Sequence, residues 1–519
     1  MRFIALVELY KNLETTTKKL EKTRMLADFY AKCSEKELYK AVVLSMGQIF
    51  PKGEQELGVA NEMMKKIIAK VTGNTEKDIV NTFKSTGDLG LTAGKLMEKR
   101  KQKALGKKEL TVDLVFDNLR KLPGLTGKGS QEKRTDLIAE LLSAASSEEA
   151  RYIVRITLGQ MRTGVAAGLI RDAIAKAFEK DKKDIEHMFN LTGDYGHVAE
   201  RAKKGIMKTD IQMSRPITVM LAERSGGLEE AMKSFKNVAL EKKYDGCRVQ
   251  IHKDGDAIKI FSRRMEDITN QFPDIVGWAK SQLKTKTCIV DGEAVAYDYA
   301  RKKTLPFQQL SRRIQRKHNI EKMVKEILIQ VNLFDIIYLD GENLMNEPLY
   351  ERWAHLKATV RQNENIRLAE HIETSDLNEA KKFYKTALAR GEEGVIVKNM
   401  DAHYQPGRRV GYWLKVKPIL EPLDLVIVGA EWGEGKRANW LSSMVLAARH
   451  DNKLLETGRM ASGFTEEQLE ELTKKLKSLV VETHGKEVNV KPEVVVEVGY
   501  EEIQKSPKYA SGYALRFPR

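Results

Sequence analysis

The sequence predicts a multidomain α+β chain with an all-helical N-terminal region, a central α/β domain and a small C-terminal β-barrel. Apolar residues recur at helical spacing over residues 1–213, and strand-like runs alternate with helical segments over residues 214–418. Short strands surround one helical segment over residues 419–519. At 519 residues the chain is long enough for three domains of ordinary size.

The composition, with 42% hydrophobic residues, is that of a globular protein. A formal net charge of +16 indicates an anionic partner, nucleic acid first of all; a merely lysine-rich surface is the alternative. Cys33, Cys247 and Cys288 lie far apart, which favours a reducing compartment and argues against a cysteine zinc site. Because the sequence has no apolar run of spanning length and no signal-peptide pattern, we expect a cytoplasmic protein without a membrane partner.

The helical region contains an internal repeat. Residues 58–90 align without a gap on residues 164–196 and are identical at about 14 of 33 positions. Upstream, residues 44–48 resemble residues 156–160. A self-match of this kind indicates a duplicated helical unit, so we expect two-fold pseudo-symmetry within residues 1–213.

Three glycine-rich turns in this region are candidates for phosphate binding. Each repeat copy ends in Thr-Gly-Asp-x-Gly, and a third turn precedes another predicted helix. Backbone N–H groups at helix N-termini bind DNA phosphates without reading sequence, whereas ordinary helix capping explains the same turns without a ligand. The candidate DNA-binding residues are Thr86, Gly87, Gly90, Gly127, Lys128, Gly129, Thr192, Gly193 and Gly196.

The central domain contains the stretch EKKYDGCR at residues 241–248. Lys243 lies two residues before an Asp-Gly turn, and residues 249–252 alternate as in a strand. A lysine amine attacks phosphorus only when it is deprotonated, a form that nearby cations and partial burial favour. Such an attack gives a phosphoramidate, which can pass the group onward. Alone, the same residues fit a surface hairpin with a solvated lysine.

The predicted elements of the last two domains follow from periodicity and turn residues. In the central domain we expect strands at residues 249–252, 257–261, 287–296, 327–338 and 394–398, and helices at residues 343–362 and 374–390. The C-terminal pattern is typical of an OB-type barrel, with strands at residues 425–430, 442–447, 488–490 and 494–500 and a helix at residues 465–480. Pro418 and Pro422 indicate a hinge between the two domains.

The residues after Lys243 supply what nucleotidyl transfer needs. Cations must neutralise phosphates, carboxylates must hold a divalent metal ion, and a flat side chain must stack on the base. Glu293 and Glu393 are candidates for the metal, and Phe334 for the base. Each residue alone fits the exposed face of a strand, but their order within one domain indicates the reaction. The candidate cations are Arg248, Arg263, Lys398, Arg409, Lys415 and Lys417.

These blocks resemble the motifs of the covalent nucleotidyltransferases, which are the DNA ligases and mRNA capping enzymes. In chain order they read EKKYDGCR, FSRR, IVDGEAV, LFDIIY, EGVIVK, WLKVK and RFPR. Together with the helical region, WLKVK and LRFPR resemble the ATP-dependent DNA ligases of the archaeal and eukaryotic replicative type. The resemblance covers essentially the whole chain.

The resemblance implies a three-step reaction on nicked duplex DNA in replication, repair and recombination. Lys243 would take AMP from ATP, AMP would pass to the 5′-phosphate of the nick, and the 3′-hydroxyl would displace it, with Mg²⁺ or Mn²⁺ assisting. The implied helical DNA-binding, nucleotidyltransferase and OB domains would close around the nick as a monomer. A capping guanylyltransferase or RNA ligase and a non-catalytic DNA-binding scaffold are the alternatives.

The resemblance also implies a role for each site residue. Glu241 would accept a hydrogen bond from the adenine amino group, and Phe334 would stack on adenine. Arg248 and Arg263 would hold the ribose and phosphate, and later the 5′-phosphate end of the nick. Glu293 would contact ribose or metal, and Glu393 would bind metal. The residues that would neutralise phosphates are Lys398, Arg409, Lys415 and Lys417.

The sequence departs from the family pattern at two places. Family members usually continue past the motif that ends here at Arg519, so we expect slower self-adenylation than in a chain with that tail restored. Archaeal relatives often carry a sliding-clamp motif that ends in paired aromatic residues, which residues 102–106 lack. We therefore do not expect a sliding clamp to bind through this segment.

Overall fold

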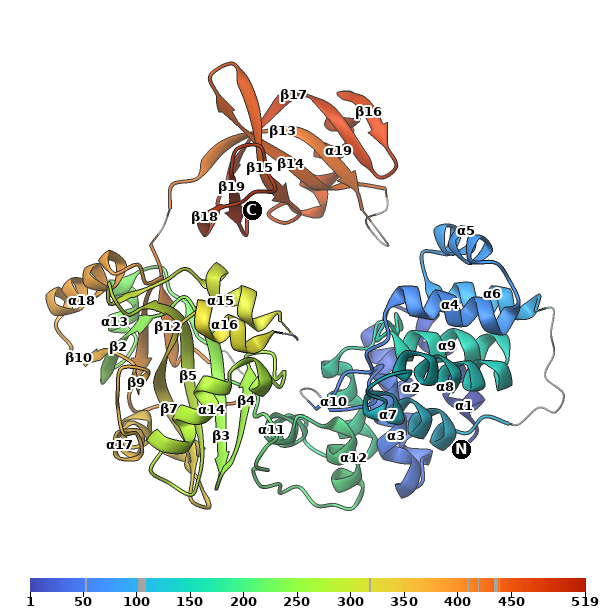
Figure 1. Ribbon diagram of the computed structural model, residues 1–519, viewed down its shortest axis with the longest axis horizontal. Helices are drawn as coiled ribbons and strands as arrows, with labels where there is room; N and C mark the ends of the chain where they lie inside the picture. The colour runs from blue at the N-terminus through green and yellow to red at the C-terminus, as the bar shows by residue number, and fades with distance from the viewer. Residues whose placement is uncertain are drawn as a thin grey trace. The chain divides into compact units, whose positions relative to one another are not determined.

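The computed structural model describes residues 1–51, 54–100, 109–316, 319–407, 410–418, 420–433, 437 and 439–519. The chain forms two compact units, Met1–Val416 and Lys417–Arg519. Figure 1 shows helices throughout the N-terminal part, strands with covering helices in the middle part, and mostly strands in the C-terminal part. Within the described ranges, no helix is long and apolar enough to cross a lipid bilayer.

The N-terminal part is helical and buries one continuous apolar core. Its helices are α1 (Phe3–Glu14), α2 (Lys19–Lys32), α3 (Glu35–Ser45), α4 (Asn61–Thr72), α5 (Glu76–Thr86), α6 (Leu89–Glu98), α7 (Val112–Lys121), α8 (Ser130–Ala144), α9 (Ser147–Thr157), α10 (Ala167–Ala177), α11 (Lys182–Thr192) and α12 (Tyr195–Lys203). A short 3₁₀ turn, Leu122–Gly124, follows α7.

The packing of these helices follows the sequence repeat. Helices α4, α5 and α6 occupy in the first copy the positions that α10, α11 and α12 occupy in the second. Each copy packs on helices that precede the other copy: α6 lies against α9 and α12 against α3, while α4 lies against α8 and α10 against α2. The two sets of contacts involve equivalent helices, as two-fold pseudo-symmetry predicts.

Two glycines allow the closest of these helix contacts. A Cβ at Gly90 would lie 2.6 Å from the backbone oxygen of Arg151 on α9, and one at Gly196 would lie 2.6 Å from the ring of Tyr39 on α3. Both glycines are buried near the start of their helices. Close packing thus explains the last glycine of each Thr-Gly-Asp-x-Gly turn.

The middle part contains two sheets. The smaller has the order β1-β12-β11-β2-β10, and the larger has the order β4-β3-β5-β7-β8, with β6 paired to β5 and β9 to β7. The strands are β1 (Glu223–Arg224), β2 (Val238–Lys243), β3 (Cys247–Asp254), β4 (Ala257–Ser262), β5 (Thr287–Asp298), β6 (Lys303–Thr304), β7 (Ile329–Leu339), β8 (Glu342–Asn343), β9 (Ile366–Leu368), β10 (His371–Glu373), β11 (Gly394–Asn399) and β12 (Trp413–Val416).

Helices cover these sheets, and the boundaries differ locally from the prediction. They are α13 (Leu228–Lys233), α14 (Pro273–Gln282), α15 (Phe307–Ile314), α16 (Ile320–Glu326), α17 (Leu349–Thr359) and α18 (Leu377–Ala389), with 3₁₀ turns at Thr269–Gln271 and Leu344–Asn346. The helix predicted at residues 343–362 is the shorter α17, because Pro348 at its N-cap is extended and β8 with the 3₁₀ turn precedes it.

The C-terminal unit is a β domain with one helix. A five-stranded antiparallel sheet has the order β15-β14-β13-β17-β16, and β18 and β19 form a separate hairpin. Its elements are β13 (Leu423–Trp432), β14 (Leu441–His450), β15 (Lys453–Met460), α19 (Glu466–Lys477), β16 (Val480–His484), β17 (Glu487–Val498), β18 (Glu502–Lys505) and β19 (Tyr513–Arg516). The strands predicted at residues 488–490 and 494–500 are the single strand β17, whose register shifts opposite β13.

Candidate active site

Lys243 is the last residue of β2, at the point where the chain leaves the smaller sheet for the larger one. Its ammonium group forms an ion pair with Glu393, and its backbone oxygen accepts a hydrogen bond from the Glu393 backbone N–H at 3.0 Å. The following turn needs Gly246, because a Cβ there would lie 2.3 Å from the Ala294 backbone oxygen on β5. The lysine side chain is 20% exposed, so a substrate can reach it.

Strand alternation puts the candidate residues of the smaller sheet on one face. Glu241 and Lys243 lie two residues apart on β2, and their cross-strand partners on β11 are Ile396 and Gly394. Lys398 on β11 lies on the same face. Its cross-strand partner on β12 is Trp413, and Lys415 lies two residues beyond it. The opposite face of this sheet packs on α13 and α18 through a separate apolar cluster.

Lys398 and Glu241 form a buried ion pair on this face, beside two aromatic rings. The Lys398 amine donates to Glu241 Oε2 at 2.7 Å, and the side chains are 3% and 4% exposed. The same amine lies 4.6 Å from the centroid of the Phe334 ring and 4.5 Å from that of Trp413. Burial raises the pKa of the Glu241 carboxyl, against the effect of Lys398. The structure thus places Lys398 beside the aromatic rings and Glu241.

Arg248 and Glu293 face the same region from the larger sheet. They are cross-strand partners on β3 and β5. Burial raises the pKa of Glu293 to about 7; Lys243 and Arg248 oppose this effect, and Glu393 and Asp245 add to it. Glu293 therefore lies within the range of charge interaction with Lys243, Glu393 and Asp245, and Glu393 itself pairs with the Lys243 amine. The structure therefore gathers the predicted nucleophile and carboxylates at one place.

The two predicted metal ligands, Glu293 and Glu393, suit the chemistry of Mg²⁺. Among the described residues, no group of three or more His, Cys, Asp or Glu side chains is arranged to hold a metal ion. Mg²⁺ is usually held by one or two carboxylates together with substrate phosphates and water. Glu293 and Glu393 fit that kind of site, in which the substrate supplies further ligands.

The other predicted cations have varied surroundings. Arg263 is exposed in the turn after β4, and Lys415 is half-buried on β12 opposite Ile396. Lys417 begins the C-terminal unit, where its amine lies 3.1 Å from Glu501 Oε2. Arg409 lies outside the described residues, as does the predicted clamp segment at residues 102–106.

The two Thr-Gly-Asp-x-Gly turns follow the capping interpretation. Asp88 Oδ1 accepts the Leu91 N–H at 2.8 Å, and Asp194 Oδ1 accepts the Gly196 N–H at 2.8 Å. These two N–H groups are therefore satisfied within the protein, and DNA binding by the turns stays a prediction. Thr86 is half-buried and Gly87 exposed, whereas the residues of the set that are buried away from solvent are Gly90, Thr192, Gly193 and Gly196.

The third turn differs from these two. Gly127, Lys128 and Gly129 are all exposed, and both glycines have positive φ, at 82° and 79°. Gly129 is the N-cap of α8 and provides no side-chain cap. A phosphate role for this turn stays a prediction. The helices α4 and α10 also begin without a side-chain cap, at Ala60 and Ala166, in the Gly-Val-Ala sequence that opens each repeat copy.

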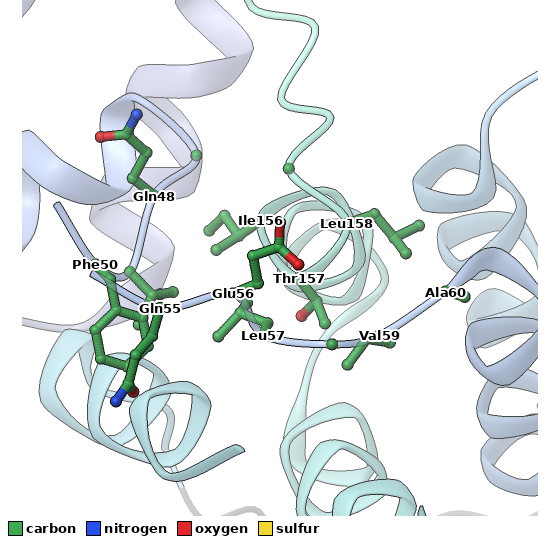
Figure 2. A pocket seen from close by; sticks show the side chains of 14 residues that line it. Gln48, Phe50, Gln55, Glu56, Leu57, Val59, Ala60, Ile156, Thr157 and Leu158 are labelled. Carbon is green, nitrogen blue, oxygen red and sulfur yellow. The ribbon is translucent and has the colours of Figure 1, made fainter. Parts of the chain in front are cut away.

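A separate cavity lies in the helical part and is not the nucleotide site. It has a volume of about 460 Å³. Figure 2 shows its lining, which joins the loop between α3 and α4 to the end of α9 through Phe50, Leu57 and Ile156. The cavity thus lies where the first repeat copy meets the second.

Sequence reasoning missed three residues around Arg248. The sequence shows Trp413 only as the first residue of the WLKVK block, yet its ring lies 5.9 Å from that of Phe334 in an edge-to-face arrangement. Asp291 and Tyr404 bind each other and Arg248. Asp291 lies two residues before Glu293 on β5, so strand alternation could have placed it on the same face.

Comparison with known proteins gives matches along the chain. The family model "ATP dependent DNA ligase domain" matches residues 219–417, "DNA ligase N terminus" matches residues 2–175, and "ATP dependent DNA ligase C terminal region" matches residues 437–519. The DNA ligase of Thermococcus onnurineus is 44% identical over 527 residues, covering 100% of this chain and 94% of the relative. The DNA ligase of Archaeoglobus fulgidus is also 44% identical, with the same coverage.

A solved structure described as "Pmar-Lig_PreS3" is similar in fold. It has a TM-score of 0.59 and 19% sequence identity, and the match covers 99% of this chain and 98% of that chain. At this identity the likeness concerns the fold alone. The full-length matches to archaeal relatives, together with the three domain matches in order, show that this chain belongs to the ATP-dependent DNA ligase family.

Proposed function

We propose that this chain seals 5′-phosphate/3′-hydroxyl nicks in duplex DNA, with ATP as the adenylate donor and Lys243 as the covalent nucleophile. The observation that carries the proposal is the position of the Lys243 amine. It lies at the junction of two sheets, beside Glu393 and on the same face of β2 as Glu241. The net charge of +16 suits a DNA substrate.

In the first step the deprotonated Lys243 amine attacks the α-phosphorus of ATP. The new N–P bond forms, the bond to the bridging oxygen breaks, and pyrophosphate leaves with that electron pair. The ammonium group that pairs with Glu393 gives up one proton to solvent before the attack, and the nitrogen gives up a second proton, to the leaving pyrophosphate, once the N–P bond has formed. Phe334 and Trp413 provide aromatic faces for the base, and Glu241 provides an acceptor for the adenine amino group.

In the second step an oxygen of the 5′-phosphate of the nick attacks the AMP phosphorus, the N–P bond breaks, and the lysine nitrogen regains a proton. In the third step the 3′-hydroxyl attacks the phosphorus of the activated 5′-phosphate and loses its proton to solvent, a new P–O bond forms, and AMP leaves as its own P–O bond breaks. Arg248, Arg263 and Lys415 supply positive charge for the phosphates. We propose the same role for Lys398, Lys417 and Arg409.

We further propose that Glu293 and Glu393 hold Mg²⁺ or Mn²⁺ when nucleotide is bound. Such a cation would neutralise charge on the phosphate oxygens.

One chain contains every motif, so we propose a monomer. The free cysteines Cys33, Cys247 and Cys288 support a reducing, cytoplasmic location. The family matches support neither a capping guanylyltransferase nor a scaffold.

The test is sealing of a labelled nick in the presence of ATP and Mg²⁺. The wild type should seal a nick with a 5′-phosphate and leave one with a 5′-hydroxyl open, and Lys243→Ala should seal neither. Lys242→Met is the matched control, because Lys242 lies next on the same strand but pairs with Glu370 on the opposite face. Sealing by Lys243→Ala would overturn the assignment of the nucleophile, and GTP outcompeting ATP would overturn the donor.

A further inference from the structure

We propose that Tyr404 is a positioning residue for the reaction, whose hydroxyl group holds Arg248 in its working orientation through Asp291. Tyr404 lies after β11, in a segment without regular secondary structure. The family resemblance implies a role for Arg248 but none for Asp291 or Tyr404. The inference rests on the nick-sealing function proposed above.

The Tyr404 hydroxyl group joins three segments of the chain. It donates to Asp291 Oδ2 at 2.8 Å and accepts from the Met220 backbone N–H at 3.1 Å. Arg248 Nη2 also lies 3.4 Å from the phenol oxygen. Tyr404 is 3% exposed, and burial raises the pKa of its hydroxyl well above the usual value, so the group stays protonated and donates.

Asp291 and Met220 in turn hold the guanidinium group. Arg248 Nη2 donates to Asp291 Oδ2 at 2.7 Å, and Nη1 donates to the Met220 backbone oxygen at 2.7 Å. Asp291 is fully buried. Because Tyr404 binds both Asp291 and Met220, it fixes the two groups that fix Arg248. A fixed guanidinium loses less conformational freedom when it binds a phosphate.

The restrained arginine faces the site with a donor to spare. Its guanidinium carbon lies 5.1 Å from the centroid of the Phe334 ring and 5.7 Å from that of Trp413. Arg248 Nε is buried and has no hydrogen-bond partner among the described residues. Of the five N–H donors of the guanidinium group, the contacts above use one on Nη1 and those of Nη2, so Nε–H and a second N–H of Nη1 are left for other acceptors, such as an oxygen of the reacting nucleotide.

A buried arginine packs against the Tyr404 ring. Arg352, which is fully buried, lies with its guanidinium carbon 5.8 Å from the Tyr404 ring and donates to the Ala402 backbone oxygen at 3.1 Å. Arg352 also pairs with the fully buried Asp335 at 2.8 Å. The tyrosine therefore links this buried pair on α17 and β7 to the arginine that faces the nucleotide.

The test measures single-turnover self-adenylation of Tyr404→Phe by intact mass. We expect the rate constant at saturating ATP to fall about tenfold, which corresponds to the loss of one hydrogen bond to a charged group. The ATP concentration at half-maximal rate should change less than about threefold, because the aromatic faces that bind the base remain. Tyr299→Phe is the matched control: it removes a hydroxyl that donates to the Ile329 backbone oxygen at 2.8 Å, and it should leave the rate unchanged.

A double-mutant cycle identifies the route of the effect. If Tyr404 acts through Arg248, Tyr404→Phe should have almost no further effect on the rate in Arg248→Ala. A full tenfold loss in that background would overturn the proposal, as would a wild-type rate for Tyr404→Phe. Asp291→Asn removes the charge of the carboxylate but keeps a side-chain oxygen that can accept from Arg248 and Tyr404, so it should show the same non-additivity. It takes the place of Tyr404→Phe in the cycle if Tyr404→Phe unfolds. Failure of the wild type to form an adduct would instead overturn the proposed function.

Discussion

The ion pair between Glu241 and Lys398 makes the sharpest prediction, because stability and nucleotide use depend on it differently. Both side chains are almost completely buried, and their charged atoms lie 2.7 Å apart. The substitution Glu241→Gln keeps the shape and one hydrogen-bond acceptor but leaves the Lys398 charge without its partner. Removal of one member of a buried pair costs about 3–5 kcal/mol. The retained neutral hydrogen bond offsets about 1 kcal/mol of this.

We therefore expect Glu241→Gln to lower the free energy of unfolding by about 2–4 kcal/mol. For the central domain, predicted at residues 214–418, that corresponds to a fall in melting temperature of about 4–16 °C. Self-adenylation with ATP should fall at least about tenfold, and the preference for ATP over GTP should narrow, because the adenine amino group loses a charged acceptor.

Two further variants separate the effects. Glu241→Gln combined with Lys398→Met should recover most of the stability, since a buried pair can often be replaced by uncharged groups, but not the self-adenylation. Glu229→Gln is the control: Glu229 pairs with Lys233 at 2.9 Å, and because both side chains are more than half exposed, the loss of this pair should leave the free energy of unfolding almost unchanged. Thermal unfolding and adduct formation for Glu241→Gln that match the wild type would refute the reasoning.

Three other predictions concern packing, pH and metal. Gly90→Ala should lower the free energy of unfolding by about 1–3 kcal/mol in a denaturant titration, because its Cβ would meet the Arg151 backbone 2.6 Å away; Gly168→Ala, with open space around it, should not, and equal values would contradict the packing argument. Burial lowers the pKa of His252 to about 3 from an unfolded value near 6.5, so its share of the stability is complete above pH 6.5 and is lost by about 1.4 kcal/mol per unit as the pH falls toward 3. His252→Phe should remove that part of the pH slope in denaturant titrations, and an unchanged slope would refute the assignment. Glu393→Gln should raise the Mg²⁺ concentration for half-maximal self-adenylation at least about tenfold; an unchanged Mg²⁺ dependence would remove Glu393 from the metal site.

Periodicity shows how much of the site the sequence could predict. Glu241 and Lys243 are two residues apart, as are Trp413 and Lys415, so alternation alone places each pair on one face of a strand. Which strands lie beside one another is decided by long-range pairing that local patterns do not encode. The contact of Lys398 with Glu241 and the aromatic rings, rather than with open solvent, therefore appeared only in the fold.

The glycine-rich turns show a second limit. Thr-Gly-Asp-x-Gly suits both phosphate binding and helix capping, and the choice depends on what lies against the turn. The aspartate of each turn accepts a hydrogen bond from an N–H group at the start of its own helix. Gly90 and Gly196 are required because α9 and α3 pack closely against them. The repeat itself was visible in the sequence, but the exchange of packing partners between its two copies was not.

The most direct test of the central claim is intact-mass measurement after incubation with ATP and Mg²⁺. The wild type and Lys242→Met should each gain a single AMP, and Lys243→Ala should gain none. Peptide mapping should place the wild-type adduct on Lys243. An AMP adduct on Lys243→Ala, or a wild type that seals nicks with ATP through an adduct at another residue, would contradict the assignment of Lys243 as the nucleophile.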